Sequence, residues 1–163
     1  MEEFSRCLKW VVTCVIREAI GYASSFGIQV IGCGSSFDGS KIGFPDEFDF
    51  LIQLFSHPCH KGSREEGYER LTQADKHTQH LRLIGTYGVW FWDKLMSYWY
   101  NHPVLHNGRA IAEGKWSFRM PLPPHQRHPD HTTCTTWVWI CSGDTFQDLA
   151  VSIDLVPGFH NEY

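Results

Sequence analysis

The sequence predicts an α/β fold, with a long N-terminal helix packed beside a mixed, strongly twisted sheet. Three patterns predict it: a helical apolar period near the N-terminus, a strand-like alternation over 47–55, and a second alternating segment with a turn over 136–156. With 163 residues, 42% of them hydrophobic and 20% charged, the chain has enough apolar material for one core. We therefore expect a single domain over 1–163.

The N-terminal helix is predicted from Glu3 to about Ala23. Apolar residues recur there at three- and four-residue spacing, as on one side of a helix. The apolar stretch 10–16 is too short to cross a bilayer, and charged residues flank it. We expect neither a signal peptide nor a membrane span, and no membrane partner.

Two strands are predicted on either side of a glycine-rich segment. Residues 28–32 form the first, and residues 47–55 form a second strand with two different faces. Alternate side chains of a strand point to opposite sides of the sheet. One face carries Phe48, Phe50, Ile52 and Leu54, and the other carries Glu47, Asp49, Leu51 and Gln53.

The patterns in the middle of the chain are weaker. We expect a polar loop over 56–67, a mostly polar helix over 68–83 and a Pro-rich loop over 121–130. Residues 89–103 predict a core-packing helix that stops at its proline. Its predicted buried side carries Trp92, Leu95, Met96 and Trp99, and the stop is Pro103.

A β-hairpin is predicted over 136–156. Two alternating segments, 136–141 and 149–156, flank a connection rich in turn residues. Val151, Ile153 and Leu155 have the character of core residues, whereas Ala150, Ser152 and Asp154 lie on the other face.

Three acids of these strands form a candidate catalytic centre. Glu47 and Asp49 share a strand face at roughly 6.8 Å between Cα atoms. Asp154 joins them if the two strands are neighbours. Three such carboxylates repel one another unless cations lie between them, and oxygen ligands of this kind suit Mg²⁺ or Mn²⁺. The arrangement predicts two ions and a phosphoryl-transfer reaction, with one ion activating a hydroxyl and the other steadying pyrophosphate.

A phosphate-binding turn is predicted beside these acids. Gly34, Ser35 and Ser36 follow a strand, and small residues there let backbone N–H groups approach phosphate oxygens. The two serines add hydroxyl donors, and Ser35 is also a candidate helix cap. The alternative for this segment taken alone is an ordinary glycine-serine loop.

Charge and cysteine content narrow the other possibilities. The formal net charge is −4, so the basic field of a typical nucleic-acid-binding domain is missing. Scattered bases at Arg6, Lys9, Arg17 and Lys41 are either a phosphate-binding surface or ordinary surface. Six cysteines without an export signal are expected to be reduced thiols, which predicts a cytoplasmic or nuclear location.

Two histidine-rich segments are candidate zinc sites. His57, Cys59 and His60 are spaced too tightly for the usual tetrahedral pattern. The second segment spaces its ligands three residues apart, about 9 Å in an extended chain. That distance is too long for a shared ion unless the loop folds back, so a solvated loop is the alternative. The second set consists of His125, His128, His131 and Cys134.

Two motifs resemble a known enzyme family. The segment GSSFDGSKIGFPDEFDFLIQL resembles the nucleotidyltransferase signature of cyclic GMP-AMP synthase-like (cGAS-like) receptors, which belong to the male-abnormal (Mab) family. The segment VSIDLVPGF is similar to the one that carries the family's third acid. The resemblance covers about 28–54 and 134–159, and eleven residues separate Ser35 from Glu47, which fits the spacing of the wider superfamily.

The resemblance implies a nucleotidyltransferase fold and a cytosolic sensor of innate immunity. Double-stranded RNA or DNA would activate the enzyme to join ATP and GTP into a cyclic dinucleotide. Ser35 would contact the donor triphosphate, the acids Glu47, Asp49 and Asp154 would ligate the metals, and Asp154 would also assist the acceptor hydroxyl. Family members continue into a helical lobe, so we expect this chain, which ends at Tyr163, to be truncated after the third acid.

Two other functions fit the same residues. A catalytically inactive Mab-family protein would act as an interaction scaffold, and the missing lobe favours that alternative. A nucleotidyltransferase that elongates RNA or modifies a protein would keep the metals and change the acceptor. The KIGFPDEFD motif favours the sensor family over this last alternative.

Overall fold

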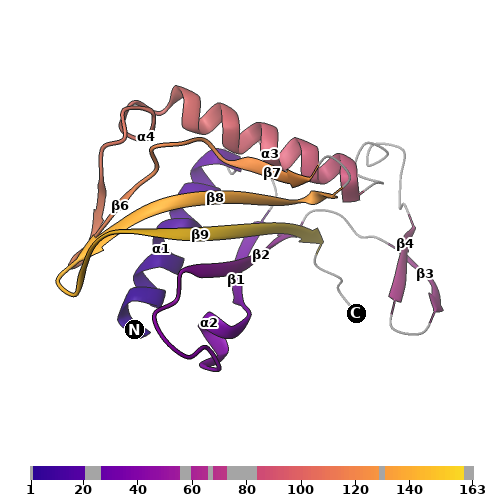
Figure 1. Cartoon of the computed structure of the whole chain (residues 1–163). Coiled ribbons are helices and arrows are strands. Elements are labelled where there is room, and N and C mark those ends of the chain that lie inside the picture. Colours follow the sequence, from indigo (N-terminus) through magenta and orange to yellow (C-terminus); the bar gives the residue numbers. More distant parts are fainter. Residues whose placement is uncertain are drawn as a thin grey trace.

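The computed structural model of the chain describes residues 2–20, 27–55, 60–65, 68–72, 84–128 and 131–159. Figure 1 shows helices on one side of a long curved sheet. The elements are α1 (Glu2–Ile20), β1 (Gly27–Cys33), α2 (Ser35–Asp38), β2 (Glu47–Phe55), β3 (His60–Glu65), β4 (Tyr68–Thr72), α3 (Ile84–Asn101), α4 (Pro103–His106), β5 (Ile111–Glu113), β6 (Trp116–Arg119), β7 (His125–His128), β8 (His131–Gly143) and β9 (Phe146–Phe159).

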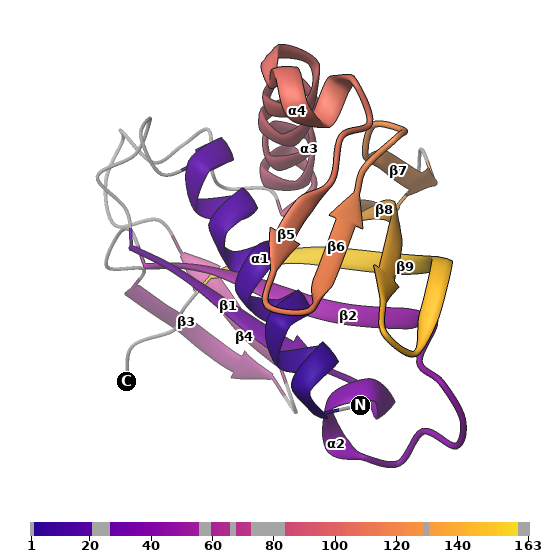
Figure 2. The same ribbon diagram turned by 90° about the vertical axis from the view of Figure 1, so that its left-hand side faces the viewer.

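A seven-stranded mixed sheet forms the body of the fold. Its strand order is β1-β2-β9-β8-β6-β5, and β7 pairs with β8 outside this path. Strands β2 and β9 run parallel, and the other pairs in this sheet are antiparallel. The sheet curls, so that β5 and β6 run across the direction of β2 (Figure 2). The predicted α/β class, with an N-terminal helix and a mixed twisted sheet, is therefore confirmed.

Helix α1 lies inside the curl of the sheet and contacts β1 and α3 (Figure 2). Glu2 and Glu3 lie in its first turn and Arg17 in its last, where each charge interacts favourably with the helix dipole. The described part of the helix ends at Ile20. The helical period is confirmed, because the buried side consists of Phe4, Leu8, Val11, Val12, Val15, Ile16 and Ile20.

An aromatic cluster around Phe4 joins α1 to the sheet. The Phe4 ring lies 5.8 Å from the ring of Phe48 on β2 and 5.1 Å from that of Trp116 on β6. Edge-to-face contacts at such distances add to the gain from burial. The cluster fixes the inward face of β2, and with it the direction in which the alternate residues of β2 point.

Helix α3 confirms the predicted core-packing helix, but its buried side differs by one position from the predicted one. Phe91, Leu95 and Trp99 are buried, whereas Trp92 and Met96 are only half-buried. The phase of this helix is ambiguous from sequence because aromatic residues occur on several sides of it. Trp92 instead donates its indole N–H to the Pro124 carbonyl at 3.2 Å. The helix ends at Asn101, before the predicted stop.

Several strands lie where the sequence predicted none. Strands β3 and β4 form an antiparallel pair, so the predicted loop over 56–67 and helix over 68–83 are wrong where the structure describes them. Only Glu66 and Gly67 separate the two strands, a length and chemistry that suit a hairpin. A polar segment also lacks the apolar stripe that stabilises a helix in a protein. The rest of 68–83 lies outside the described residues.

Two further strand regions lie between α4 and β8. Residues 111–119, for which the sequence predicted no element, form the hairpin β5–β6, whose turn contains Gly114 at φ 59°. Strand β7 lies within the segment that was predicted to be a Pro-rich loop. Its backbone forms a strand because it pairs with the backbone of β8. None of the described helices is long and apolar enough to cross a membrane.

Candidate metal centre

The three predicted acids lie on two neighbouring strands. Glu47 and Asp49 are at the start of β2, and Asp154 is on β9, which pairs with β2 in parallel. In this register Asp49 is the direct partner of Asp154, and Glu47 is the partner of Ser152. The sequence predicted that Asp154 joins the other two acids if the two strands are neighbours, and the strands are neighbours.

The acids converge on one small region. One carboxylate oxygen from each of Glu47, Asp49 and Asp154 lies within 4.8 Å of the other two. Glu47 is exposed, Asp49 is half-buried and Asp154 is buried. Within the described ranges, these three residues are the one group of at least three possible metal ligands.

The charge of this cluster favours a cation. Two carboxylates about 4 Å apart repel by roughly 4 kcal/mol at the effective dielectric constant near a protein surface, and solvent screens the exposed Glu47 further. All the donors are hard oxygen atoms, and they come from a rigid pair of strands. The cluster can therefore hold a metal ion, and its donor set suits Mg²⁺ or Mn²⁺.

Asp154 is held from the neighbouring strand. Thr136 of β8 is its direct register partner and donates its hydroxyl to Asp154 Oδ1 at 2.7 Å. Both side chains are buried. Thr136 was not among the predicted site residues. The pairing shifts by one residue near the hairpin turn, so that counting back from the turn would place Thr136 opposite Ile153 rather than Asp154.

Gly34 brings the backbone against the second acid. Its φ is 74°, and a Cβ built at this position would lie 2.7 Å from Asp49 Oδ2. A side chain at this position would be strained by the backbone angle and would also displace the carboxylate. The predicted closeness of the glycine turn to the acids is confirmed.

The helix α2 differs in detail from the expected phosphate-binding turn. Gly34 is the N-cap, its carbonyl accepts from the N–H groups of Phe37 and Asp38, and no side chain caps the helix. The predicted cap at Ser35 is therefore wrong, because Ser35 is already the first helical residue. Its side chain is exposed.

Ser36 connects this turn to strand β2. Its hydroxyl donates to the backbone carbonyl of Glu47 at 2.6 Å. This contact fixes the start of β2 relative to α2, and so positions the first acid. The sequence predicted that the Ser36 hydroxyl donates to phosphate, whereas in the structure its one proton is donated to the Glu47 carbonyl.

The loop between α2 and β2 is closed by contacts near its two ends. Lys41 Nζ lies 2.8 Å from Asp46 Oδ1, and the Asp46 carbonyl accepts from the Ser152 N–H at 2.7 Å. The hydrogen bond from Lys41, with a further backbone hydrogen bond, lowers the pKa of Asp46. These contacts attach the loop to β9 two residues before Asp154.

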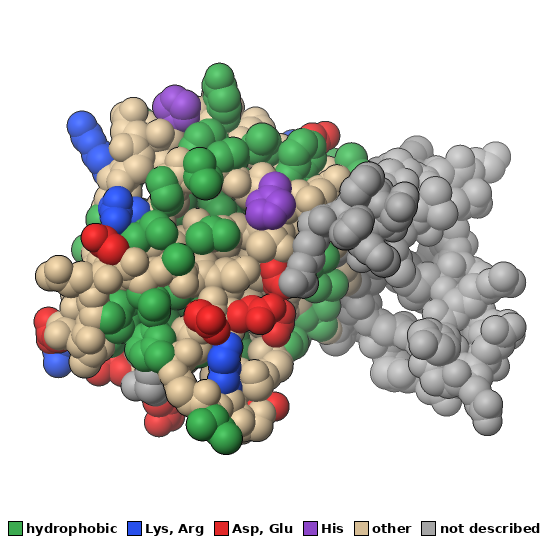
Figure 3. All heavy atoms as spheres, viewed as in Figure 1, with side chains coloured by type: hydrophobic (Ala, Val, Ile, Leu, Met, Phe, Trp, Pro, Cys, Tyr) green, Lys and Arg blue, Asp and Glu red, His purple; other side chains and the backbone are tan. Residues whose placement is uncertain are grey.

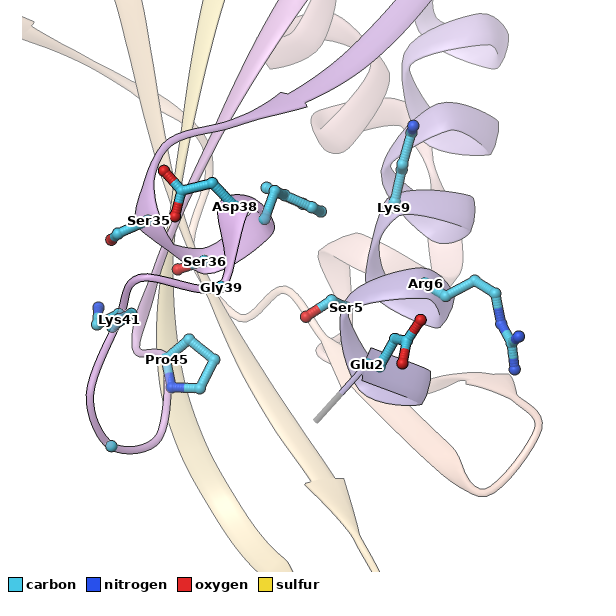
Figure 4. A pocket seen from close by; sticks show the side chains of 12 residues that line it. Glu2, Ser5, Arg6, Lys9, Ser35, Ser36, Asp38, Gly39, Lys41 and Pro45 are labelled. Atoms are coloured by element: carbon cyan, nitrogen blue, oxygen red, sulfur yellow. The ribbon is translucent and has the colours of Figure 1, made fainter.

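A pocket of about 590 Å³ lies between α1 and this loop (Figure 4). Three of the four predicted surface bases line it, but Glu2 and Asp38 do so as well, and Lys41 is paired with Asp46. In Figure 4 the Arg6 side chain points away from the loop. None of the three acids lines this pocket. Its charge is mixed, and Ser35 and Ser36 of the predicted phosphate-binding turn also line it.

Apolar side chains adjoin the acids on the open face of the sheet. Figure 3 shows acidic side chains gathered near the middle of this view, with hydrophobic side chains above and below them. Leu51 follows Asp49 on the same face of β2, and its register partner Val156 is 37% exposed. The metal centre therefore borders a surface that suits a flat, partly apolar group.

The predicted histidine sites fall mostly on side chains outside the described set. His57 and Cys59 lie outside the described residues, and only the backbone of His60 is described. In the second set the chain folds back on itself, because His128 and His131 are register partners on β7 and β8. Zinc binding by His125, His128, His131 and Cys134 stays a prediction.

Comparison with known proteins adds no relative. No model of a known protein family matches the chain, and a search of curated proteins finds no match. The assignment of this centre therefore depends on its own geometry and chemistry.

Proposed function

We propose that the chain is a nucleotidyltransferase of the cyclic GMP-AMP synthase-like type, which makes a cyclic dinucleotide from ATP and GTP. The observation that carries the proposal is the convergence of Glu47, Asp49 and Asp154 within 4.8 Å on adjacent parallel strands. Asp49 and Asp154 are 105 residues apart in the sequence. A strand pairing that brings such distant acids together supports a built site rather than a chance surface cluster.

The chemistry that suits this donor set is phosphoryl transfer. Two bound Mg²⁺ or Mn²⁺ ions would activate an attacking hydroxyl and neutralise the leaving pyrophosphate. Glu47 and Asp49, at the start of β2, would hold the ions. Asp154, the buried acid, would complete the ligand set and orient toward the acceptor hydroxyl.

The turn at Gly34 supports a nucleotide as the substrate. The backbone passes directly against Asp49, and Ser35 is exposed at the start of α2. Phosphate oxygens at this turn would meet N–H groups and a hydroxyl while sharing the metal ions of the acids. Ser36 would contribute by holding Glu47, since its hydroxyl already donates to the strand.

The nucleobase has a candidate surface beside the acids. Leu51 and Val156 are register partners on the open face, next to Asp49 and Asp154. A base placed there would bury apolar area while its triphosphate lies at the metals. Double-stranded RNA or DNA as the activating ligand, and a cytoplasmic or nuclear location, remain part of the proposal.

The proposal is tested by product analysis. The purified chain is incubated with ATP, GTP, Mg²⁺ or Mn²⁺, and double-stranded RNA or DNA, and the nucleotides are identified by mass spectrometry. We expect a linked dinucleotide from the wild type and none from the Asp49→Asn/Asp154→Asn variant. If metal binds but no linked product forms, the scaffold alternative is favoured. If RNA is elongated instead, the acceptor is different from the one proposed.

A further inference from the structure

The deepest acid of the metal centre is held by a hydroxyl from a third strand. Thr136 Oγ1 lies 2.7 Å from Asp154 Oδ1, and the two residues are direct partners across the antiparallel pair β8–β9. Thr136 is 8% exposed and Asp154 is 3% exposed. The contact therefore lies deeper in the protein than the carboxylates of Glu47 and Asp49.

The contact provides a hydrogen-bond partner for a carboxyl group that burial has removed from water. Buried polar atoms need such partners, because leaving them unpaired costs free energy. The distance of 2.7 Å is ordinary for a hydroxyl that donates to a carboxyl oxygen. Thr136 therefore holds Oδ1 of Asp154 in a defined position beside the other two acids.

The threonine also restricts how Asp154 presents its oxygens. A β-branched side chain on a strand has few rotamers, so its hydroxyl is held in place by the backbone of β8. With Oδ1 engaged by this hydroxyl, rotation of the carboxylate is restricted before an ion arrives. Removing a residue that orients a metal ligand in this way typically lowers metal affinity about 10- to 100-fold.

We infer that Thr136 is a positioning residue of the metal centre, which orients the Asp154 carboxylate for divalent-cation binding. The inference rests on the proposed function, since it requires that the three acids bind metal. It assigns a role to a residue that contributes no carboxylate and lies on a different strand from all three acids.

The test compares Mn²⁺ binding by variants that differ in one hydroxyl. Thr136→Val keeps the shape and removes the donor, and we expect its Mn²⁺ affinity to fall about 10- to 100-fold. Thr136→Ser keeps the hydroxyl, and we expect an affinity within about threefold of wild type. Thr136→Ala serves as a second donor-free variant if the valine variant does not fold. Melting temperatures without metal confirm that each variant is folded.

A double-mutant cycle separates positioning from a general effect on the fold. In the Asp154→Asn background, Thr136→Val should change Mn²⁺ affinity by less than about twofold, because the group that it orients has gone. An equal loss in both backgrounds, or wild-type affinity of the folded Thr136→Val variant, would overturn the inference. Failure of the metal centre itself is distinguishable, because the wild type would then bind no Mn²⁺.

Discussion

Strands β2 and β9 each have one face that packs in the core and one face that carries the candidate metal ligands. The inward face buries Phe48 and Phe50 from β2 and Ile153 and Leu155 from β9 against the aromatic core. On β2 the outward face carries two acids at alternate positions, one exposed and one half-buried. A step of one residue along the strand therefore separates a residue that holds the fold from one that can hold a metal.

This comparison teaches how the site is kept rigid. The acids are positioned by the backbone of their strands. That backbone is held in place because the residues that alternate with the acids are packed in the core. Asp154 departs from the simple division, since it faces the site yet is buried. Substitutions on the two faces should accordingly change different measured quantities.

The largest expected effect belongs to the inward face. Phe48 is fully buried, so Phe48→Ala leaves a cavity and should lower the free energy of unfolding by about 3 to 5 kcal/mol. Chemical denaturation measures it. The matched control is Gln53→Ala on the open face of the same strand, which should change stability by less than about 0.5 kcal/mol. Similar losses for both variants would show that the two faces are not divided as described.

The next effect belongs to the outward face and depends on metal. Mn²⁺ at about 100 times its dissociation constant should raise the wild-type unfolding free energy by about 2.7 kcal/mol for each ion that binds. A chelator should remove this gain. Asp49→Asn should fold to within about 1 kcal/mol of wild type without metal and gain clearly less than wild type from the same Mn²⁺ concentration. Thermal or chemical unfolding with and without Mn²⁺ measures both quantities, and an equal gain in the variant would contradict the assignment.

A smaller effect is expected where the backbone approaches the acids. Gly34→Ala should lower the unfolding free energy by about 1 kcal/mol and weaken Mn²⁺ binding by about tenfold. The reason is that its Cβ would meet Asp49 Oδ2. Gly39→Ala is the control, since Gly39 has φ 79° but no atom within 4 Å of a built Cβ. If both variants weaken Mn²⁺ binding equally, contact with Asp49 is not the cause.

The smallest effect concerns the loop that leads into β2. Lys41 lowers the pKa of Asp46 below the ordinary value of 3.8 by a hydrogen bond and by its charge. The stabilisation is present above pH 3.8 and is lost as the pH falls through the lowered pKa of the folded state. An NMR titration should show this lowered pKa, and Lys41→Met should raise it toward 3.8. An unchanged pKa in the variant would rule out Lys41 as the cause.

Local pattern was sufficient for the elements that carry the centre. Strand β2 alternates between buried and less buried residues, and much of the hairpin β8–β9 does the same, because one face of each packs on the core. Thr136 and Asp154 are exceptions, since both are buried on the other face. The same alternation placed Glu47 and Asp49 outward. Whether β2 and β9 are neighbours could not be predicted from local pattern, since no local signal joins residues 105 positions apart.

The features that sequence reasoning missed depend on tertiary contacts or on weak periods. The hydrogen bond from Ser36 to Glu47 exists because a loop returns to the sheet. Strands β3 and β4 have mostly polar sequences, which do not distinguish a strand from a helix. In α3 the aromatic residues adjoin one another, so Trp92 and Phe91 were equally plausible core residues until packing selected Phe91.

Mn²⁺ titration followed by electron paramagnetic resonance tests the central claim most directly. It compares the wild type with a variant that removes all three charges, Glu47→Gln/Asp49→Asn/Asp154→Asn. We predict that the wild type binds two Mn²⁺ ions and that the folded variant binds neither. Equal binding by the two proteins, or no binding by the wild type, would contradict the assignment of these acids as a metal centre.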